Sequence, residues 1–150
     1  MAELPAELYE QIALLCDEGN ELLDQEQFDP ALTRFSSAWK LLPEPKTDWE
    51  AAVWILTAIA DAHFFREDFA AMRTPLMTAM RCDGSTDNPF LRLRLGQCLF
   101  ELGELHEAAN WLTGAFLLEG TKIFAADDPK YLAFIKSKLS PPPGGWPKGW

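Results

Sequence analysis

Histidine and cysteine, the residues that most often bind metals or attack substrates, are scarce in this sequence. There are two histidines, His63 and His106, and three cysteines, and no Cys-x-x-Cys, His-x-x-x-His or His-Glu-x-x-His pattern includes them. The sequence also lacks a Gly-x-Ser-x-Gly elbow and a phosphate-binding glycine loop. Acid–base catalysis by paired acids such as Asp17 and Glu18 would need apolar residues on both sides, and the sequence does not place them there. We therefore interpret these acids as solvated helix ends. We therefore expect no metal, no cofactor and no catalytic residue, and a protein that is not an enzyme.

Features of secretion and membrane insertion are missing as well. The cysteines Cys16, Cys82 and Cys98 are odd in number and have no paired spacing. This predicts small buried side chains and no disulfide. No apolar run approaches the length that spans a bilayer, and no basic region precedes an apolar stretch near the first residue. The sequence thus predicts a cytoplasmic protein with no membrane partner.

Positive charge is sparse and unevenly spread. Lys and Arg total 13 against 23 Asp and Glu, for a formal net charge of −10. Residues 1–50 hold twelve acids and three bases, whereas residues 51–100 hold five of each. Nucleic acid is not an expected partner, because phosphate binding needs a basic surface. The acidic first third either steers a basic protein toward the chain or serves solubility alone.

No stretch alternates apolar and polar residues for long enough to form a strand, whereas apolar residues recur every three or four positions. Asp29-Pro30, Asn88-Pro89 and Asp128-Pro129 each place a capping side chain before a proline, and Asp48 is predicted to cap another helix. The sequence therefore predicts an all-α fold. The expected helices lie near residues 5–25, 30–42, 49–66, 68–81, 89–102, 105–118 and 129–138.

One pattern of spacings occurs three times along the chain, at offsets of 41 and 36 residues. Each copy predicts a helix-turn-helix unit in which a small residue on the first helix lets the second helix pack closely, and an alanine on the second helix lets the next unit stack. The copies comprise Gly19, Leu22, Phe28, Ala31, Phe35 and Ala38; Ala60, His63, Phe69, Met72, Leu76 and Ala79; and Gly96, Leu99, Leu105, Ala108, Leu112 and Ala115.

This pattern resembles the tetratricopeptide repeat over roughly residues 12–120. Ala60 and Met72 depart from the repeat signature, whereas Pro43 follows the first copy as the signature requires. The resemblance implies three repeats in a short right-handed superhelical array, closed by the helix at 129–138 as a C-terminal cap. The expected organisation is a single helical domain over residues 1–139 and an extended tail rich in Pro, Gly and Trp over residues 140–150.

A narrower resemblance concerns the segments Pro43-Glu44-Pro45-Lys46, Asn88-Pro89-Phe90 and Asp128-Pro129-Lys130-Tyr131. They are similar to small stand-alone bacterial tetratricopeptide proteins found beside polymorphic toxins. This implies an immunity protein, an antitoxin that binds and neutralises one basic toxin domain. Two alternatives remain open: a chaperone or adaptor for a secretion substrate, and a self-assembling structural scaffold.

In tetratricopeptide arrays the first helix of each repeat lines a concave groove that binds proteins, so the register predicts the groove positions. A clamp for acidic C-termini is not expected, because Cys16 and Leu93 stand where such clamps place Lys and Arg. The acids favour a basic or amide-rich ligand. Trp146 and Trp150 in the tail either anchor a partner or dock on the protein itself. The predicted groove residues are Asn20, Asp24, Trp54, Thr57, Asp61, Phe65, Phe90, Gln97 and Glu101.

Overall fold

The computed structural model describes residues 3–140 and 143–145, and this part of the chain contains seven α-helices and no strand. The all-α prediction is confirmed, and each predicted helix end lies within two residues of the observed one. Trp146 and Trp150 lie outside the described residues. The helices are Ala6–Asp24 (α1), Phe28–Leu41 (α2), Glu50–Phe65 (α3), Phe69–Met80 (α4), Pro89–Glu101 (α5), Leu105–Glu119 (α6) and Lys130–Lys138 (α7). Short 3-10 helices span Lys46–Asp48 (η1), Ser85–Asp87 (η2) and Gly120–Phe124 (η3).

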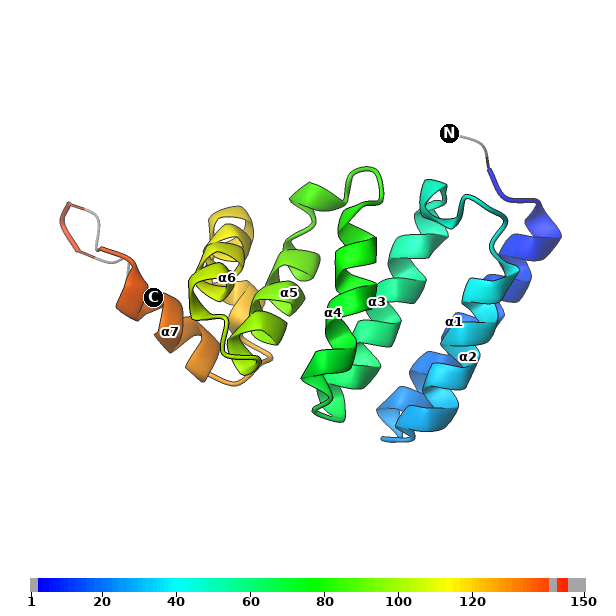
Figure 1. Ribbon diagram of the computed structural model, residues 1–150, viewed down its shortest axis with the longest axis horizontal. Coiled ribbons are helices and arrows are strands. Elements are labelled where there is room, and N and C mark those ends of the chain that lie inside the picture. Colours follow the sequence, from blue (N-terminus) through cyan, green and yellow to red (C-terminus); the bar gives the residue numbers. More distant parts are fainter. Residues whose placement is uncertain (1–2, 141–142, 146–150) are drawn as a thin grey trace. The chain divides into compact units, whose positions relative to one another are not determined.

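The chain divides into two compact units, the first ending at Thr86 and the second beginning at Asp87. Unit 1 contains the hairpins α1–α2 and α3–α4, with α3 packed against both α1 and α2. Unit 2 contains the hairpin α5–α6, against which η3 and α7 pack. Figure 1 shows the three hairpins, each made of neighbouring antiparallel helices. The superhelical arrangement and the single domain over residues 1–139 stay predictions.

Small residues bring the two helices of a hairpin together, as the repeat pattern predicts. A Cβ atom on Gly19 of α1 would overlap the Phe35 ring of α2, and one on Gly96 would lie 2.6 Å from Cγ of Leu112. The matching position in the second hairpin is Ala60, whose side chain is fully buried. The α1–α2 and α5–α6 hairpins therefore depend on close helix approach at a glycine, and the α3–α4 hairpin has a small buried residue at the matching position.

The three hairpin turns share one backbone geometry. Glu26, Glu67 and Gly103 occupy the same place in their turns and have φ values of 60°, 62° and 82°. In each turn the next residue donates its backbone N–H to a carbonyl five residues earlier, which is the Schellman form of helix ending. These bonds run from Gln27 to Leu22 (2.9 Å), from Asp68 to His63 (2.8 Å) and from Glu104 to Leu99 (2.9 Å).

Two of the four predicted helix caps are confirmed. Asn88 accepts hydrogen bonds from the backbone N–H groups of Phe90 and Leu91, and Asp128 accepts one from that of Lys130. The predictions for Asp29 and Asp48 are wrong. Helix α2 begins at Phe28, directly after the turn, which leaves Asp29 inside its first turn, and Asp48 lies in η1.

Asp68 caps α4, a role that was not predicted from the sequence. Its carboxylate accepts a hydrogen bond from the Ala71 backbone N–H at 3.2 Å. That bond is the main reason that the pKa of Asp68 lies below its usual value. Arg66 joins this corner of unit 1, because its guanidinium bonds both Asp68 and the Asp29 carboxylate of the preceding hairpin.

Candidate functional site

The described residues give no sign of a metal site or a membrane span. No group of three or more His, Cys, Asp or Glu side chains among residues 3–140 and 143–145 is placed to hold a metal ion. Within the same residues, every helix is too short or too polar to cross a bilayer.

The formal charge of the chain belongs entirely to unit 1. Residues up to Thr86 include sixteen acids and six Lys or Arg, whereas residues from Asp87 onward include seven of each. Unit 1 thus carries a formal charge of −10, and unit 2 is neutral. A charged partner would experience attraction or repulsion mainly at unit 1.

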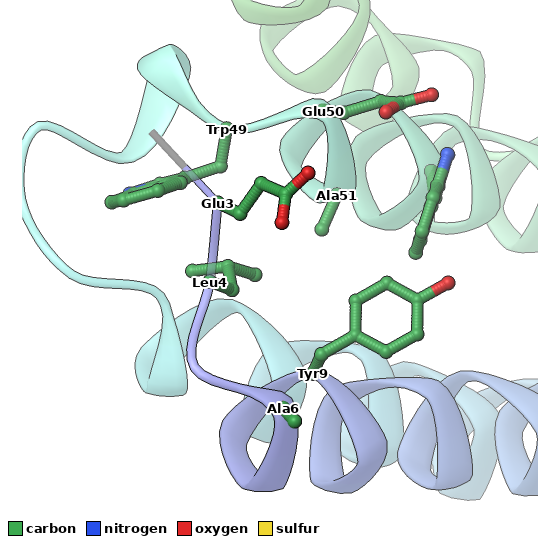
Figure 2. Close-up of a pocket in the computed structure, with 8 residues that line it drawn as sticks. Glu3, Leu4, Ala6, Tyr9, Trp49, Glu50 and Ala51 are labelled. Atoms are coloured by element: carbon green, nitrogen blue, oxygen red, sulfur yellow. The ribbon is translucent and has the colours of Figure 1, made fainter. Parts of the chain in front are cut away.

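Unit 1 contains a pocket of about 480 Å³ at the N-terminal ends of α1 and α3. Its walls come from three places: the extended segment before α1, the first turns of α1, and the beginning of α3 with the residue before it (Figure 2). Two helices and an extended segment thereby converge on one concave space. The lining residues are Glu3, Leu4, Ala6, Tyr9, Trp49, Glu50, Ala51 and Trp54.

Three aromatic rings form much of this pocket. The rings of Tyr9 and Trp54 have centroids 5.7 Å apart and planes 80° apart, so they meet edge to face as two walls of a corner. The third ring is fixed by a hydrogen bond, because the Trp49 indole N–H donates to the Pro43 carbonyl at 2.8 Å. Tyr9 is 45% exposed and Trp54 38% exposed, so a ligand could reach both.

Two carboxylates accompany the rings. Figure 2 shows the Glu3 side chain extending from the segment before α1 into the space between Trp49 and Tyr9, with Glu50 on the α3 side. Glu50 is the first residue of α3. None of the eight lining residues is basic, and within the described residues neither glutamate is in an ion pair. The pocket is therefore both aromatic and negatively charged.

Of the groove residues predicted in unit 1, one lies in this pocket and the others continue along α1 and α3. Trp54 lines the pocket. Farther along α3, Thr57 and Asp61 are half-buried, and Phe65 near the helix end is 52% exposed. On α1, the side chains of Asn20 and Asp24 are exposed.

The cysteine of the predicted groove face, Cys16, is half-buried, whereas Cys82 and Cys98 are buried, and no disulfide joins the three. Burial is the main cause that raises the pKa of the Cys16 thiol, with a smaller effect of Asp17. Cys16 therefore resembles a small apolar side chain, as predicted, but with part of its surface accessible.

Most of the pocket was not predicted from the sequence. Tyr9 precedes Cys16 by seven residues and Asn20 by eleven, which places it on the same face of α1. That periodicity could have identified Tyr9. Trp49 and Glu50 begin the helix that was predicted over residues 49–66, whereas nothing in the sequence placed Glu3 and Leu4 beside them.

In unit 2 the predicted groove residues differ from this arrangement. Phe90 is 61% exposed, but Leu93 is buried and Gln97 has no exposed surface. The Gln97 side chain donates to Asp127 at 3.0 Å and accepts from Arg94 at 2.8 Å, and Arg94 also pairs with Asp127 at 3.3 Å. Gln97 thus bonds to the segment before α7, so within unit 2 its amide already has partners.

Glu101 is engaged in the same way. Its carboxylate accepts a hydrogen bond from the Tyr131 hydroxyl at 2.8 Å and pairs with Lys130 at 2.5 Å. Burial raises the pKa of Tyr131, and the bond to Glu101 raises it further. The Phe100 ring packs edge to face against Tyr131 and Phe134. Helix α7 therefore closes unit 2, as a capping helix does.

Comparison with known structures identifies similar folds. The chain resembles the Arabidopsis OM64 TPR domain at TM-score 0.70 and 20% identity over 88% of this chain and 99% of that one. It resembles the first TPR of Spaghetti (RPAP3) bound to HSP90 peptide SRMEEVD at TM-score 0.65 and 18% identity, over 85% and 92%. The second TPR domain of human RPAP3, in complex with HSP70 peptide SGPTIEEVD, gives TM-score 0.66 and 16% identity, over 89% and 99%. The chain thus has the tetratricopeptide-repeat (TPR) fold.

No protein-family model matches the chain, and no curated protein matches it in sequence.

Proposed function

We propose that this chain is a protein-binding TPR module, without catalytic activity of its own, whose partner is a basic protein domain. The observation that carries the proposal is the concentration of the whole formal charge of −10 in unit 1, which also holds the aromatic pocket. Opposite charge speeds association and selects among partners, and exposed aromatic side chains are frequent anchors at interfaces. The structures of the two RPAP3 TPR domains, each with a bound peptide, support a binding role for the fold.

The proposed ligand differs from the peptides in those two structures. Both peptides end in the acidic sequence Glu-Glu-Val-Asp. On the α1 and α3 faces of unit 1 this chain presents the neutral residues Asn20 and Thr57 and the acid Asp24, and its pocket adds Glu3 and Glu50. An acidic peptide would be repelled from this surface, and a basic one attracted.

The narrower proposal is an immunity protein that neutralises a toxin domain encoded beside it. Inhibition requires affinity and shape complementarity, and an acidic inhibitor suits a basic toxin because their fields attract at a distance. The same chemistry would serve a chaperone or adaptor for a basic secretion substrate. A self-assembling scaffold fits less well, because α7 packs on the α5–α6 hairpin as a closing element.

The proposal predicts that the acids of α1 accelerate partner capture. The probe is the purified basic domain encoded by the reading frame next to this gene, mixed with the chain in a stopped-flow fluorimeter. We expect Asp17→Asn, Glu21→Gln and Asp24→Asn together to slow association about tenfold at low salt. Because salt screens the charges, the difference should shrink at about 0.5 M NaCl.

The matched control removes the same number of charges from unit 2, through Asp87→Asn, Glu107→Gln and Glu119→Gln. It should leave the association rate within about twofold of the wild type. Equal slowing by both triple variants would contradict a role for unit 1. An adjacent reading frame without a basic domain, or one whose product does not bind, would contradict the immunity assignment.

A further inference from the structure

We infer that the pocket at the start of α1 and α3 receives one arginine side chain of the partner. This inference rests on the proposed function, since it specifies which group of a basic partner enters unit 1. The pocket volume of about 480 Å³ lies within the range of roughly 300–1,000 Å³ that ligand pockets usually have.

The aromatic rings select for a flat cation. Tyr9 and Trp54 form a corner with their planes 80° apart, and Trp49 stands on another side of the pocket. A guanidinium within about 6 Å of a ring centroid is attracted by the π electrons and can stack on the ring as well. A carboxylate or phosphate would meet the same electron density and be repelled.

The two glutamates supply the matching anions. The charged group of a ligand in this pocket would be near Glu3 and Glu50, and none of the lining residues that the structure describes offers a competing internal cation. A guanidinium can donate two parallel hydrogen bonds to one carboxylate while its plane rests on an aromatic face. An uncharged apolar side chain would leave both carboxylates without partners, and so would gain only the contact with the rings.

Arginine fits this combination better than lysine. An ammonium group is compact and strongly hydrated, and it interacts with carboxylates as a point charge. It would use the carboxylates but gain little from the corner between Tyr9 and Trp54. The structure therefore points to a guanidinium as the preferred cation.

The test uses a small probe and does not need the partner. N-acetyl-arginine amide is titrated into the full chain, and the indole N–H signals of Trp49 and Trp54 are followed by NMR. N-acetyl-citrulline amide, which has the same shape without the charge, and N-acetyl-lysine amide serve as comparison ligands. We expect both indole signals to shift with the arginine probe, about fivefold weaker binding of the lysine probe, and no saturable shift with citrulline.

Variants of the lining residues show whether the arginine probe binds in this pocket. Glu50→Gln and Trp54→Leu should each weaken arginine binding about fivefold, because each removes one type of contact. Glu3→Gln should have a similar effect, and since residue 3 lies outside the helices, this variant cannot act by unfolding one. The control is Glu10→Gln. Glu10 is exposed and follows Tyr9 in the sequence, but it does not line the pocket. This variant should change binding less than twofold.

Several outcomes would overturn the inference. They are absence of a saturable shift with arginine, equal binding of arginine and citrulline, equal binding of arginine and lysine, and equal loss in Glu10→Gln and Glu50→Gln. None of these outcomes contradicts the proposed function, because that function depends on capture of a basic domain by unit 1 and is tested by association rates. Slow association of the α1 triple variant with no arginine binding would retain the function and reject the pocket.

Discussion

At the scale of single residues, the hairpin turns place two glutamates in a backbone conformation that favours glycine. Glu26 and Glu67 have φ near +60°, where the Cβ of an L-residue crowds the following carbonyl. The third turn has Gly103 at the same place. The repeats therefore share a turn geometry that only one of them adopts without this steric cost.

We predict that Glu26→Gly stabilises the chain by about 1 kcal/mol and that Gly103→Ala destabilises it by about the same amount. Urea unfolding followed by circular dichroism measures both free energies. Glu21→Gly is the control, because Glu21 lies within α1, where glycine costs about 1 kcal/mol. A loss of stability in Glu26→Gly like that in Glu21→Gly would show that the left-handed turn carries no strain.

At the scale of elements, the segment before α7 is fixed to α5 by side chains that are largely buried. Asp127 bonds both Arg94 and Gln97, and the Arg94 and Asp127 side chains are 15% and 12% exposed. Removing one partner of such a pair leaves a charge with little water around it, which costs more than the pair itself contributes. The segment before α7 is therefore a sensitive point of unit 2.

Asp127→Ala should destabilise the chain by about 3 kcal/mol, because Arg94 and Gln97 lose their shared acceptor. Chemical unfolding measures the change, and α7 should gain faster amide exchange than α5. Glu119→Ala removes the exposed ion pair with Lys122 and should cost less than about 1 kcal/mol. Similar losses in the two variants would mean that burial adds nothing to the Asp127 contacts.

The sequence predicted the elements well, because their signals are local. Apolar residues recur with the period of a helix, and the small residues Gly19 and Gly96 indicate where hairpin helices meet. The helix caps were predicted less well. An Asp before a Pro can be the N-cap residue of a helix, or it can already lie in the first turn of that helix. At Asp29 the turn geometry of the preceding residues decided the outcome, and no capping rule contains that information.

The site was predicted only in part, because it depends on contacts between distant segments. Periodicity placed Trp54 on the face of α3 that lines the pocket, and it could have added Tyr9 on α1. Glu3 and Leu4 belong to an extended segment with no periodic pattern, so only the three-dimensional structure places them at the pocket. Gln97 shows the opposite case. Its register indicated a groove position, but Asp127 and Arg94 occupy its hydrogen-bonding groups.

At the scale of the whole molecule, the two units differ in charge. Unit 1 carries a formal charge of −10, whereas unit 2 carries none. Like charges on a folded unit repel one another and favour expansion, and at 0.1 M salt this repulsion is largely screened between charges more than about 10 Å apart. The stability of the two units should consequently respond differently to ionic strength.

Raising NaCl from about 0.01 M to about 0.2 M should stabilise unit 1 against opening by up to about 1 kcal/mol and leave unit 2 nearly unchanged. Hydrogen exchange followed by mass spectrometry resolves the two, because peptides from α1–α4 and from α5–α7 are measured separately. Equal responses of both sets of peptides would show that the charge of unit 1 is too dispersed to weaken it.

The origin of the pocket wall that carries Glu3 and Leu4 has a practical consequence. This wall is an extended segment, and no helix holds it in place. A purification tag fused ahead of Met1 would be separated from Glu3 only by residues 1 and 2, and the histidines of a polyhistidine tag would, when protonated, place cations beside an acidic pocket. A tag after Trp150 leaves Glu3 and Leu4 with their natural neighbours in sequence, so the choice of tagged end decides whether a binding assay measures the partner or the tag.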